Sequence, residues 1–179
     1  MDKKVEIRRE VRQRIKALDE GYKRAAAHTI FERIEVLEHF ASARCIALYA
    51  AMGDEVPTEE VLGRWHMSGR RIVVPRVEGE IMRFYDYDPT TMTSGAYGIS
   101  EPQGEVECNA EDIDLIIVPA RAFTRSGIRL GRGGGFYDKY MSLKGFRAHK
   151  SGVAFECQIF DSLPYADHDI LVDEVITER

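Results

Sequence analysis

The sequence is short of the residues that build disulfide frameworks and metal centres. Among its 179 residues there are three cysteines, an odd number without C-x-x-C spacing, and five histidines without H-x-x-x-H or H-E-x-x-H pairing. This pattern argues against a structural disulfide, a zinc site and a histidine-based metal centre. It is typical of a protein from a reducing compartment, so we expect a cytoplasmic location.

Long apolar runs are also missing. No stretch approaches the ~20 residues that a membrane-spanning helix needs, and residues 2–18 predict a charged helix rather than a secretory signal. The composition, 44% hydrophobic and 31% charged, is that of an ordinary soluble protein long enough to bury a full core. We expect a single domain over residues 1–179 and no membrane partner.

Several catalytic signatures are missing as well. There is no G-x-S-x-G turn for a serine nucleophile, no P-loop pattern G-x-x-x-x-G-K-[ST], and no cysteine in a setting that marks it as reactive. The sequence therefore predicts no activated nucleophile, and a nucleotide site of another kind. An enzyme with this sequence would work by placing and neutralising phosphate charge.

The most informative stretch is residues 130–138, LGRGGGFYD, which holds four glycines. It lies between a strand predicted at residues 113–119 and a short helical pattern at 136–143. Glycine lets the backbone take positive φ and bring N–H groups close to a ligand, and such a loop at the start of a helix binds phosphate. Taken alone, the glycines are explained better by a flexible surface turn, and only the strand–loop–helix setting and the local charge favour phosphate binding.

The charge distribution supports the phosphate interpretation. Residues 121–150 carry eight Lys/Arg and one acid, a net charge of +7, whereas the rest of the chain has 17 basic and 29 acidic residues, a net charge of −12. A cationic segment on an acidic protein favours an anionic small ligand, since nucleic-acid binders usually have a broadly basic face. We expect no nucleic-acid partner, and the charge does not identify the ligand.

Alternating strand and helix patterns predict the architecture. We expect a single-domain α/β fold with a layered, mostly parallel, Rossmann-like sheet flanked by helices. Asp19 and Thr58 are predicted helix caps. The expected helices cover residues 2–18, 20–39, 58–67 and 136–143; the strands cover 45–50, 71–75, 82–87 (more exposed), 113–119, 152–155 and 171–176; and residues 88–112 are loop-rich.

Four side chains stand where such sheets bind ligands. Met52 and Glu55 follow the strand at 45–50, although Glu55 reads equally as a surface acid. Asp138 follows the glycine loop and Asp169 lies in a late loop; both suit Mg²⁺ if the loop holds a triphosphate, whereas Asp138 alone reads as a first-turn helix acid. Residues 97–102 form either a pocket wall or a covering loop.

The motifs, taken together, resemble one family. VPA at 118–120, AFT at 122–124 and GIRLGRGGGFYD at 127–138 are supported by Met52, DEVPT at 54–58, VPR at 74–76, HD at 168–169 and VDEV at 172–175. In this order, over almost the whole chain, they resemble the 5-formyltetrahydrofolate cyclo-ligase (5,10-methenyltetrahydrofolate synthetase) family. The resemblance implies a monomeric enzyme that uses ATP and Mg²⁺ to convert 5-formyltetrahydrofolate to 5,10-methenyltetrahydrofolate, releasing ADP and phosphate. The formyl oxygen is phosphorylated, and N10 closes the ring and expels phosphate.

The resemblance also implies roles for individual residues. Arg132 is the expected catalytic group, stabilising the migrating phosphoryl group. Asp138 and Asp169 are expected to hold Mg²⁺. The expected ATP-binding residues are Lys4, Arg8, Arg129, Gly131, Arg132, Gly133, Gly134, Gly135, Phe136 and Tyr137, and the expected folate-binding residues are Ala50, Met52, Glu55 and Tyr137.

Three positions depart from the family's pattern. Gly134 stands where some members have Lys, so that one phosphate contact is either missing or supplied by Arg125. Phe136 replaces a frequent Tyr, and Ala120 a frequent Gly. Two other functions stay open on the residues alone: a phosphoryl-transferring or sugar-phosphate enzyme of related fold, and a non-catalytic folate or nucleotide sensor.

Overall fold

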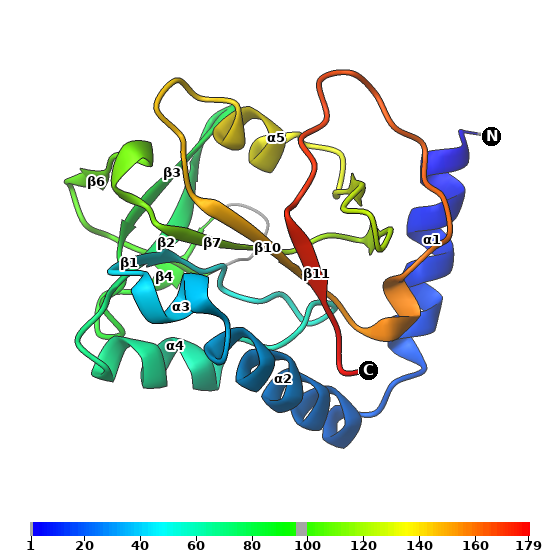
Figure 1. The fold of residues 1–179 in the computed structure, drawn as a ribbon, viewed down its shortest axis with the longest axis horizontal. Helices are drawn as coiled ribbons and strands as arrows, with labels where there is room; N and C mark the ends of the chain where they lie inside the picture. The colour runs from blue at the N-terminus through cyan, green and yellow to red at the C-terminus, as the bar shows by residue number, and fades with distance from the viewer. Residues whose placement is uncertain (1, 96–99) are drawn as a thin grey trace.

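The computed structural model describes residues 2–95 and 100–179. Within these ranges a seven-stranded sheet has the order β11-β10-β7-β1-β2-β3-β6 (Figure 1). Its first five strands run parallel, and β3 and β6 are antiparallel to their neighbours. The bounds are β1 Cys45–Ala47, β2 Arg71–Glu78, β3 Ile81–Asp86, β6 Glu107–Cys108, β7 Leu115–Val118, β10 His149–Val153 and β11 Glu174–Ile176. The predicted α/β class, with a mostly parallel sheet, is confirmed.

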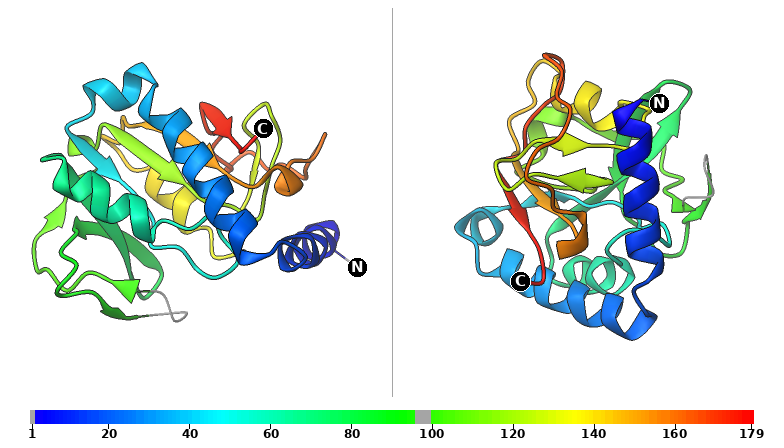
Figure 2. Two further views of the ribbon diagram at one scale, coloured as in Figure 1. Left: turned by 90° about the horizontal axis from the view of Figure 1, so that it is seen from below. Right: turned by 90° about the vertical axis from the view of Figure 1, so that its right-hand side faces the viewer.

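Helices cover both faces of the sheet (Figures 1 and 2). Along β7, Leu115 and Ile117 face a core shared with α1 and α2, whereas Ile116 and Val118 face a second core that contains Tyr140 of α5. This alternation follows from the two-residue repeat of a strand buried on both sides. The helices are α1 Lys3–Lys16, α2 Glu20–Glu35, α3 Glu38–Ser42, α4 Glu59–Met67 and α5 Phe136–Met141.

The helix boundaries correct two expectations. The Asp19 carboxylate accepts a hydrogen bond from Tyr22 N at 2.7 Å, as predicted for a cap, but the helix predicted to reach residue 39 ends at Glu35 and is followed by α3. Thr58 does not cap α4 through its side chain. Its buried hydroxyl instead accepts a hydrogen bond from Ala51 N at 2.9 Å, which fixes the loop after β1.

Other differences lie in the chain after β2. The strand predicted as exposed, β3, buries Met82 and Phe84, because β2 and β6 flank it and Tyr140 of α5 packs on Phe84. Strand β10 begins earlier than predicted, and β11 is shorter. The loop-rich stretch contains β4 Thr93–Ser94, β5 Ser100–Glu101, β6 and a short 3₁₀ turn, Ala110–Asp112. Residues 97–99 of the predicted pocket wall lie outside the described residues.

The hairpin of β8 Ala122–Phe123 and β9 Arg129–Leu130 connects β7 to the glycine loop. Its turn is attached to the late loop, because Val172 N donates a hydrogen bond to Gly127 O at 3.0 Å. Gly127 has φ of 99°, and a Cβ there would lie 2.3 Å from Val172 O. Across the described ranges, no helix has both the length and the apolar character needed to cross a membrane.

Gly127→Ala should lower the free energy of unfolding by about 2–4 kcal/mol, because it adds left-handed strain and a backbone clash. A matched control is Gly63→Ala in α4, where a Cβ meets nothing within 4 Å and stability should rise by about 0.5–1 kcal/mol. Urea unfolding of both variants measures the difference. Equal stability of Gly127→Ala and the parent chain would contradict the attachment described above.

Candidate active site

A cavity of about 530 Å³ lies beyond the carboxyl ends of β1 and β7. Its size suits a small molecule, and its position is where open α/β sheets bind ligands. The cavity is lined by every residue that the sequence predicted for a site: Lys4, Arg8, Ala50, Met52, Glu55, Arg129, Gly131, Arg132, Gly133, Gly134, Gly135, Phe136, Tyr137, Asp138 and Asp169. The structure therefore brings these residues together; the ligand that each one binds stays a prediction.

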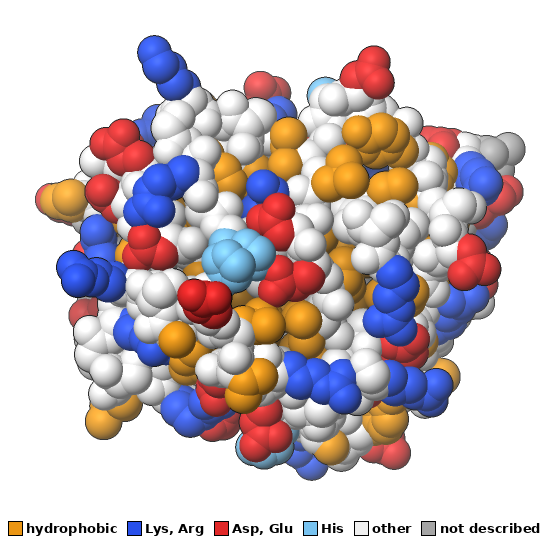
Figure 3. Space-filling model, viewed as in Figure 1, with side chains coloured by type: hydrophobic (Ala, Val, Ile, Leu, Met, Phe, Trp, Pro, Cys, Tyr) orange, Lys and Arg blue, Asp and Glu red, His pale blue; other side chains and the backbone are white. Residues whose placement is uncertain are grey.

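A second hollow of about 570 Å³ has a different character. On the face of the molecule that Figure 3 shows, histidine side chains bordered by acidic ones lie near the centre. His39 stacks on His149 there, with ring centroids 3.5 Å apart, and His149 contacts Glu174. Arg147 pairs with Asp114 at 2.7 Å. Because its basic groups are matched by acids, this hollow is a poorer anion site than the glycine-lined cavity.

The glycine loop forms one wall of the cavity. Gly133 and Gly135 have φ of 115° and 70°, values that residues with a Cβ rarely adopt, and Gly135 leads directly into α5. Backbone turns with residues in this region of φ occur in anion-binding loops of other proteins, where their N–H groups bind the anion.

Helix α1 is attached to this loop. Arg8 Nε donates a hydrogen bond to Gly131 O at 2.8 Å, and Lys4, one turn earlier, also lines the cavity. The resemblance implied that Lys4 and Arg8 share a site with the glycine loop, and the structure brings both residues to the cavity that the loop lines.

Arg129 is the most buried cation of the site. Its side chain is 7% exposed, Nε donates to Pro119 O at 2.9 Å, and the guanidinium lies 5.0 Å from the centroid of the Tyr137 ring. Burial lowers the pKa of Arg129, while the nearby Asp138 carboxylate acts against that shift. Both effects indicate a positive charge that a bound anion would stabilise.

Asp138 and Asp169 each have one carboxylate oxygen fixed by the backbone. Asp138 accepts from Ile170 N at 3.0 Å and Asp169 from Ala166 N at 2.9 Å. The remaining oxygens lie 3.9 Å from Arg129 Nη1 and 3.5 Å from His168 Nε2. Among the described residues no group of three or more His, Cys, Asp or Glu could hold a metal. Two carboxylates do fit Mg²⁺, which usually takes its remaining ligands from phosphate and water.

Asp54 and Glu55 have opposite titration behaviour. Asp54 forms ion pairs with Arg121 and Arg132, and Glu55 Oε1 accepts from Met52 N at 2.8 Å while its Oε2 lies 3.8 Å from Arg132. Burial raises the pKa of Glu55 above its ordinary range. Burial also acts on Asp54, but the hydrogen bonds and charges of Arg132 and Arg121 outweigh it and lower the pKa of that carboxyl.

Sequence reasoning missed part of the lining. Arg121 is buried beside Asp54, and although it was counted in the cationic segment, nothing local marked it as a site residue. Arg125, the suggested substitute for a missing cation, is not among the lining residues and pairs with Glu156 instead. Glu101 belongs to the stretch 97–102 that the sequence offered as a pocket wall, and it lines the cavity. The other lining residues not predicted are Tyr49, Pro75, Val77, Met82, Pro119, Ala120, Leu130 and His168.

Gly134 and Phe136 both depart from the family's pattern, and the Phe136 ring occupies the space that a side chain at position 134 would need. A Cβ at Gly134 would lie 2.6 Å from Cε2 of the Phe136 ring. The ring therefore lies where a side chain at position 134 would begin, and any larger residue there requires Phe136 to move.

Comparison with known proteins agrees with this geometry. A model of the 5-formyltetrahydrofolate cyclo-ligase family matches residues 1–178. The chain belongs to the 5-formyltetrahydrofolate cyclo-ligase family. This confirms the resemblance found in the sequence and the prediction that the chain is an enzyme of this family.

Individual cyclo-ligases align over most of the chain. The 5-formyltetrahydrofolate cyclo-ligase of Mus musculus is 27% identical, over 96% of this chain and 92% of the mouse protein. The Mycolicibacterium smegmatis enzyme is 30% identical, over 77% and 75%. The solved structure of 5,10-methenyltetrahydrofolate synthetase from Aquifex aeolicus matches with a TM-score of 0.86 at 33% identity, over 98% of this chain and 90% of that one. The Mycoplasma pneumoniae synthetase shares the fold, with a TM-score of 0.80 at 23% identity, over 99% and 100%.

The two adjacent acids should give opposite pH effects on stability. The folded-state pKa of Asp54 is lowered, so its contribution to stability is present near neutral pH and is lost as the pH falls through that pKa. Asp54→Asn should therefore destabilise the protein most near neutrality.

The folded-state pKa of Glu55 is raised, so ionised Glu55 opposes folding increasingly as the pH rises from the ordinary carboxyl range. Glu55→Gln, which keeps an acceptor for Met52 N, should gain stability relative to the parent chain over that interval.

Urea unfolding between about pH 4 and about pH 7 tests both variants. Differences of the same sign for the two variants, or differences independent of pH, would contradict the assigned environments.

Proposed function

We propose that the protein catalyses the ATP- and Mg²⁺-dependent cyclisation of 5-formyltetrahydrofolate to 5,10-methenyltetrahydrofolate, with release of ADP and phosphate. Support comes from the family membership and from one structural observation: the glycine loop, the α1 cations and the loop after β1 line a single cavity. A phosphate-binding wall beside a second, more apolar wall suits a reaction that joins a nucleotide to an organic acceptor.

The reaction depends on how ATP and the formyl group are positioned, and it requires no covalent intermediate with the protein. An N-formyl carbon is amide-like and its oxygen leaves poorly, so transfer of the γ-phosphoryl group to that oxygen creates a leaving group. N10 then attacks the formyl carbon and loses its proton to solvent, the carbon–oxygen bond breaks, and phosphate departs. This route needs no protein nucleophile, and none was predicted from the sequence.

The cationic residues have distinct proposed roles. Lys4, Arg8 and the amides of residues 131–135 bind the phosphates of ATP, and Arg129 adds a buried charge. Arg132 stabilises the migrating phosphoryl group; its guanidinium has five donors, so it can keep Asp54 while contacting phosphate. Asp138 and Asp169 hold Mg²⁺, which neutralises phosphate charge when bound.

The folate half of the cavity uses the loop after β1. Ala50 and Met52 pack against the pterin, Glu55 hydrogen-bonds it, and Tyr137 lies between the two ligands. Burial raises the pKa of the Glu55 carboxyl, and its oxygens can accept hydrogen bonds from the pterin.

The direct test mixes the protein with 5-formyltetrahydrofolate, ATP and Mg²⁺ and follows the absorbance of the methenyl product. We expect the absorbance to rise only when all three are present. ATP binding without product would indicate a sensor, and phosphate release without folate would indicate a different phosphoryl-transferring enzyme; either result would overturn the proposal.

Arg132→Ala should lower kcat by about 10²- to 10³-fold while changing the KM for ATP by less than about fivefold, because the interaction forms mainly in the transition state. Arg125→Ala is the matched control: it removes a neighbouring arginine that lies outside the cavity, and its kinetics should equal those of the parent enzyme. If Arg132→Ala weakens only ATP affinity, Arg132 is a ground-state ligand.

A further inference from the structure

One wall of the cavity is built on a strand edge that β1 does not cover. β2 pairs with β1 only over residues 71–73, so its second half has β3 on one side and the segment 100–104 near the other. The N–H of Val77 would be an unpaired donor at this edge, and such groups need a partner when water is excluded. Glu101 provides it: its Oε2 accepts from Val77 N at 2.8 Å.

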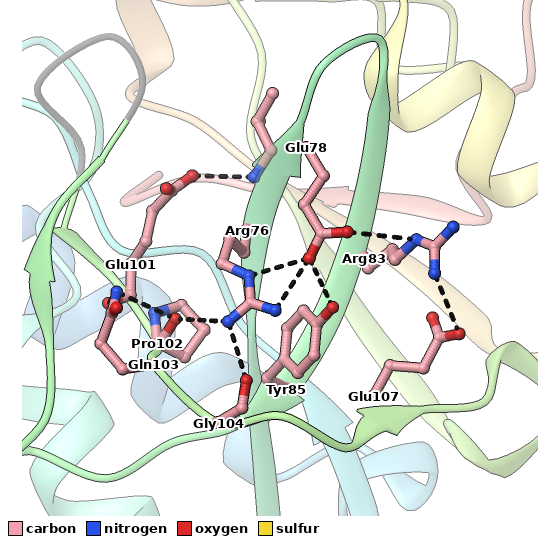
Figure 4. A network of polar contacts seen from close by, with 10 residues as sticks. Arg76, Glu78, Arg83, Tyr85, Glu101, Pro102, Gln103, Gly104 and Glu107 are labelled. Atoms are coloured by element: carbon pink, nitrogen blue, oxygen red, sulfur yellow. Dashed lines mark hydrogen bonds and ion pairs between the residues drawn. The ribbon is translucent and has the colours of Figure 1, made fainter.

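Arg76 attaches the same segment from the neighbouring position. Its Nη1 donates to Pro102 O at 3.1 Å and to Gly104 O at 2.8 Å, while its Nε donates to Glu78 at 2.9 Å. The guanidinium also stacks on Tyr85, with Cζ 3.7 Å from the ring centroid. Figure 4 shows Arg76 between the β2–β3 hairpin and the segment 100–104, so its guanidinium group contacts both.

The Glu101 carboxylate is enclosed in an unusual way. Glu101 is only 6% exposed, it lines the cavity, and among the described residues no Lys or Arg pairs with it. A Cβ at Gly95 would lie 1.7 Å from Glu101 Oε1, so glycine at this position leaves the room that the carboxylate needs. A buried carboxyl group needs hydrogen-bond partners, and Val77 N supplies one to Glu101.

The cavity wall supported by this contact is apolar. Pro75, Val77 and Met82 line it, whereas the cations of the cavity come from α1, the glycine loop and its neighbours. An apolar wall suits the ring system of a substrate and does not suit a triphosphate.

We infer that Glu101 is a positioning residue for the folate half of the cavity: by accepting from Val77 N it holds the segment 100–104 against β2 and sets the wall on which the substrate's rings pack. The inference rests on the proposed function. It predicts an effect on folate affinity that is separate from ATP affinity.

Glu101→Ala should raise the KM for 5-formyltetrahydrofolate about tenfold and leave the KM for ATP within about twofold. Glu101→Gln keeps an oxygen acceptor for Val77 N, and its KM values should stay within about twofold of those of the parent enzyme. An unchanged folate KM in Glu101→Ala would overturn the inference. Equal impairment of the two variants would also overturn it, because the charge rather than the acceptor would then matter.

Two further variants separate the contact from general loosening of the hairpin. Gly95→Ala should reproduce the rise in folate KM, because its methyl group displaces the carboxylate while Glu101 itself is retained. Glu107→Gln is the matched control: Glu107 belongs to the same network, pairs with Arg83 at 3.4 Å and does not line the cavity, so both KM values should be unchanged (Figure 4). A rise in folate KM in Glu107→Gln equal to that of Glu101→Ala would overturn the inference.

Binding measured without turnover distinguishes this inference from the proposed function. Calorimetric titration of each full-length variant with 5-formyltetrahydrofolate, and separately with ATP, should give the same selective loss. If the parent protein binds folate but does not cyclise it, the proposed function fails and the binding comparison still decides the role of Glu101. If it turns over normally and Glu101→Ala binds folate equally well, only the inference fails; if it binds no folate, both fail.

Discussion

The cavity depends on guanidinium groups that are held by backbone carbonyl oxygens. Arg8 donates to Gly131 O and Arg129 to Pro119 O. A carbonyl oxygen satisfies a donor but brings only a partial charge, and the Asp138 carboxylate lies no closer than 3.9 Å to Arg129 Nη1. In a chain with a net charge of −5, these contacts fix the arginines and preserve a local positive potential. The lowered pKa of buried Arg129 reflects the unfavourable free energy of that arrangement, which a bound anion offsets.

A second feature of the cavity is a carboxylate that forms ion pairs with two cations. Asp54 pairs with both Arg121 and Arg132, so one negative charge positions two positive ones and leaves an excess. Glu55 is paired less closely, because its Oε2 lies 3.8 Å from Arg132, and burial raises its pKa. The adjacent acids therefore divide two tasks between them: Asp54 orders the cations, and Glu55 presents a carboxyl to the cavity.

How much of this could be predicted depends on the range of the interactions involved. The glycine loop, the Asp19 cap and the strand at 113–119 are encoded by neighbouring residues, and the sequence predicts them. Arg121 became a site residue only through its contact with a distant segment, which no local pattern contains. For Glu101 the sequence left two interpretations of residues 97–102, a pocket wall and a covering loop, and the contact with Val77 that positions it is not encoded locally. Thr58 shows the same limit: its capping signal is local, but burial beside the loop after β1 directs its hydroxyl to Ala51 instead.

Position 134, where some family members have Lys, is a glycine in this chain, and the structure gives a physical reason for that difference. Because the Phe136 ring fills the space where a side chain at 134 would start, Gly134 and Phe136 have to be considered as a pair. The positive charge of a lysine at 134 is not replaced by Arg125, which pairs with Glu156 outside the cavity. A cation beside the loop is Lys139, whose Nζ lies 5.9 Å from the Phe136 ring centroid and whose Cε would lie 3.9 Å from a Cβ at Gly135. The ring that excludes a side chain at position 134 thus lies next to a lysine one turn into α5, although Lys139 is not among the residues that line the cavity.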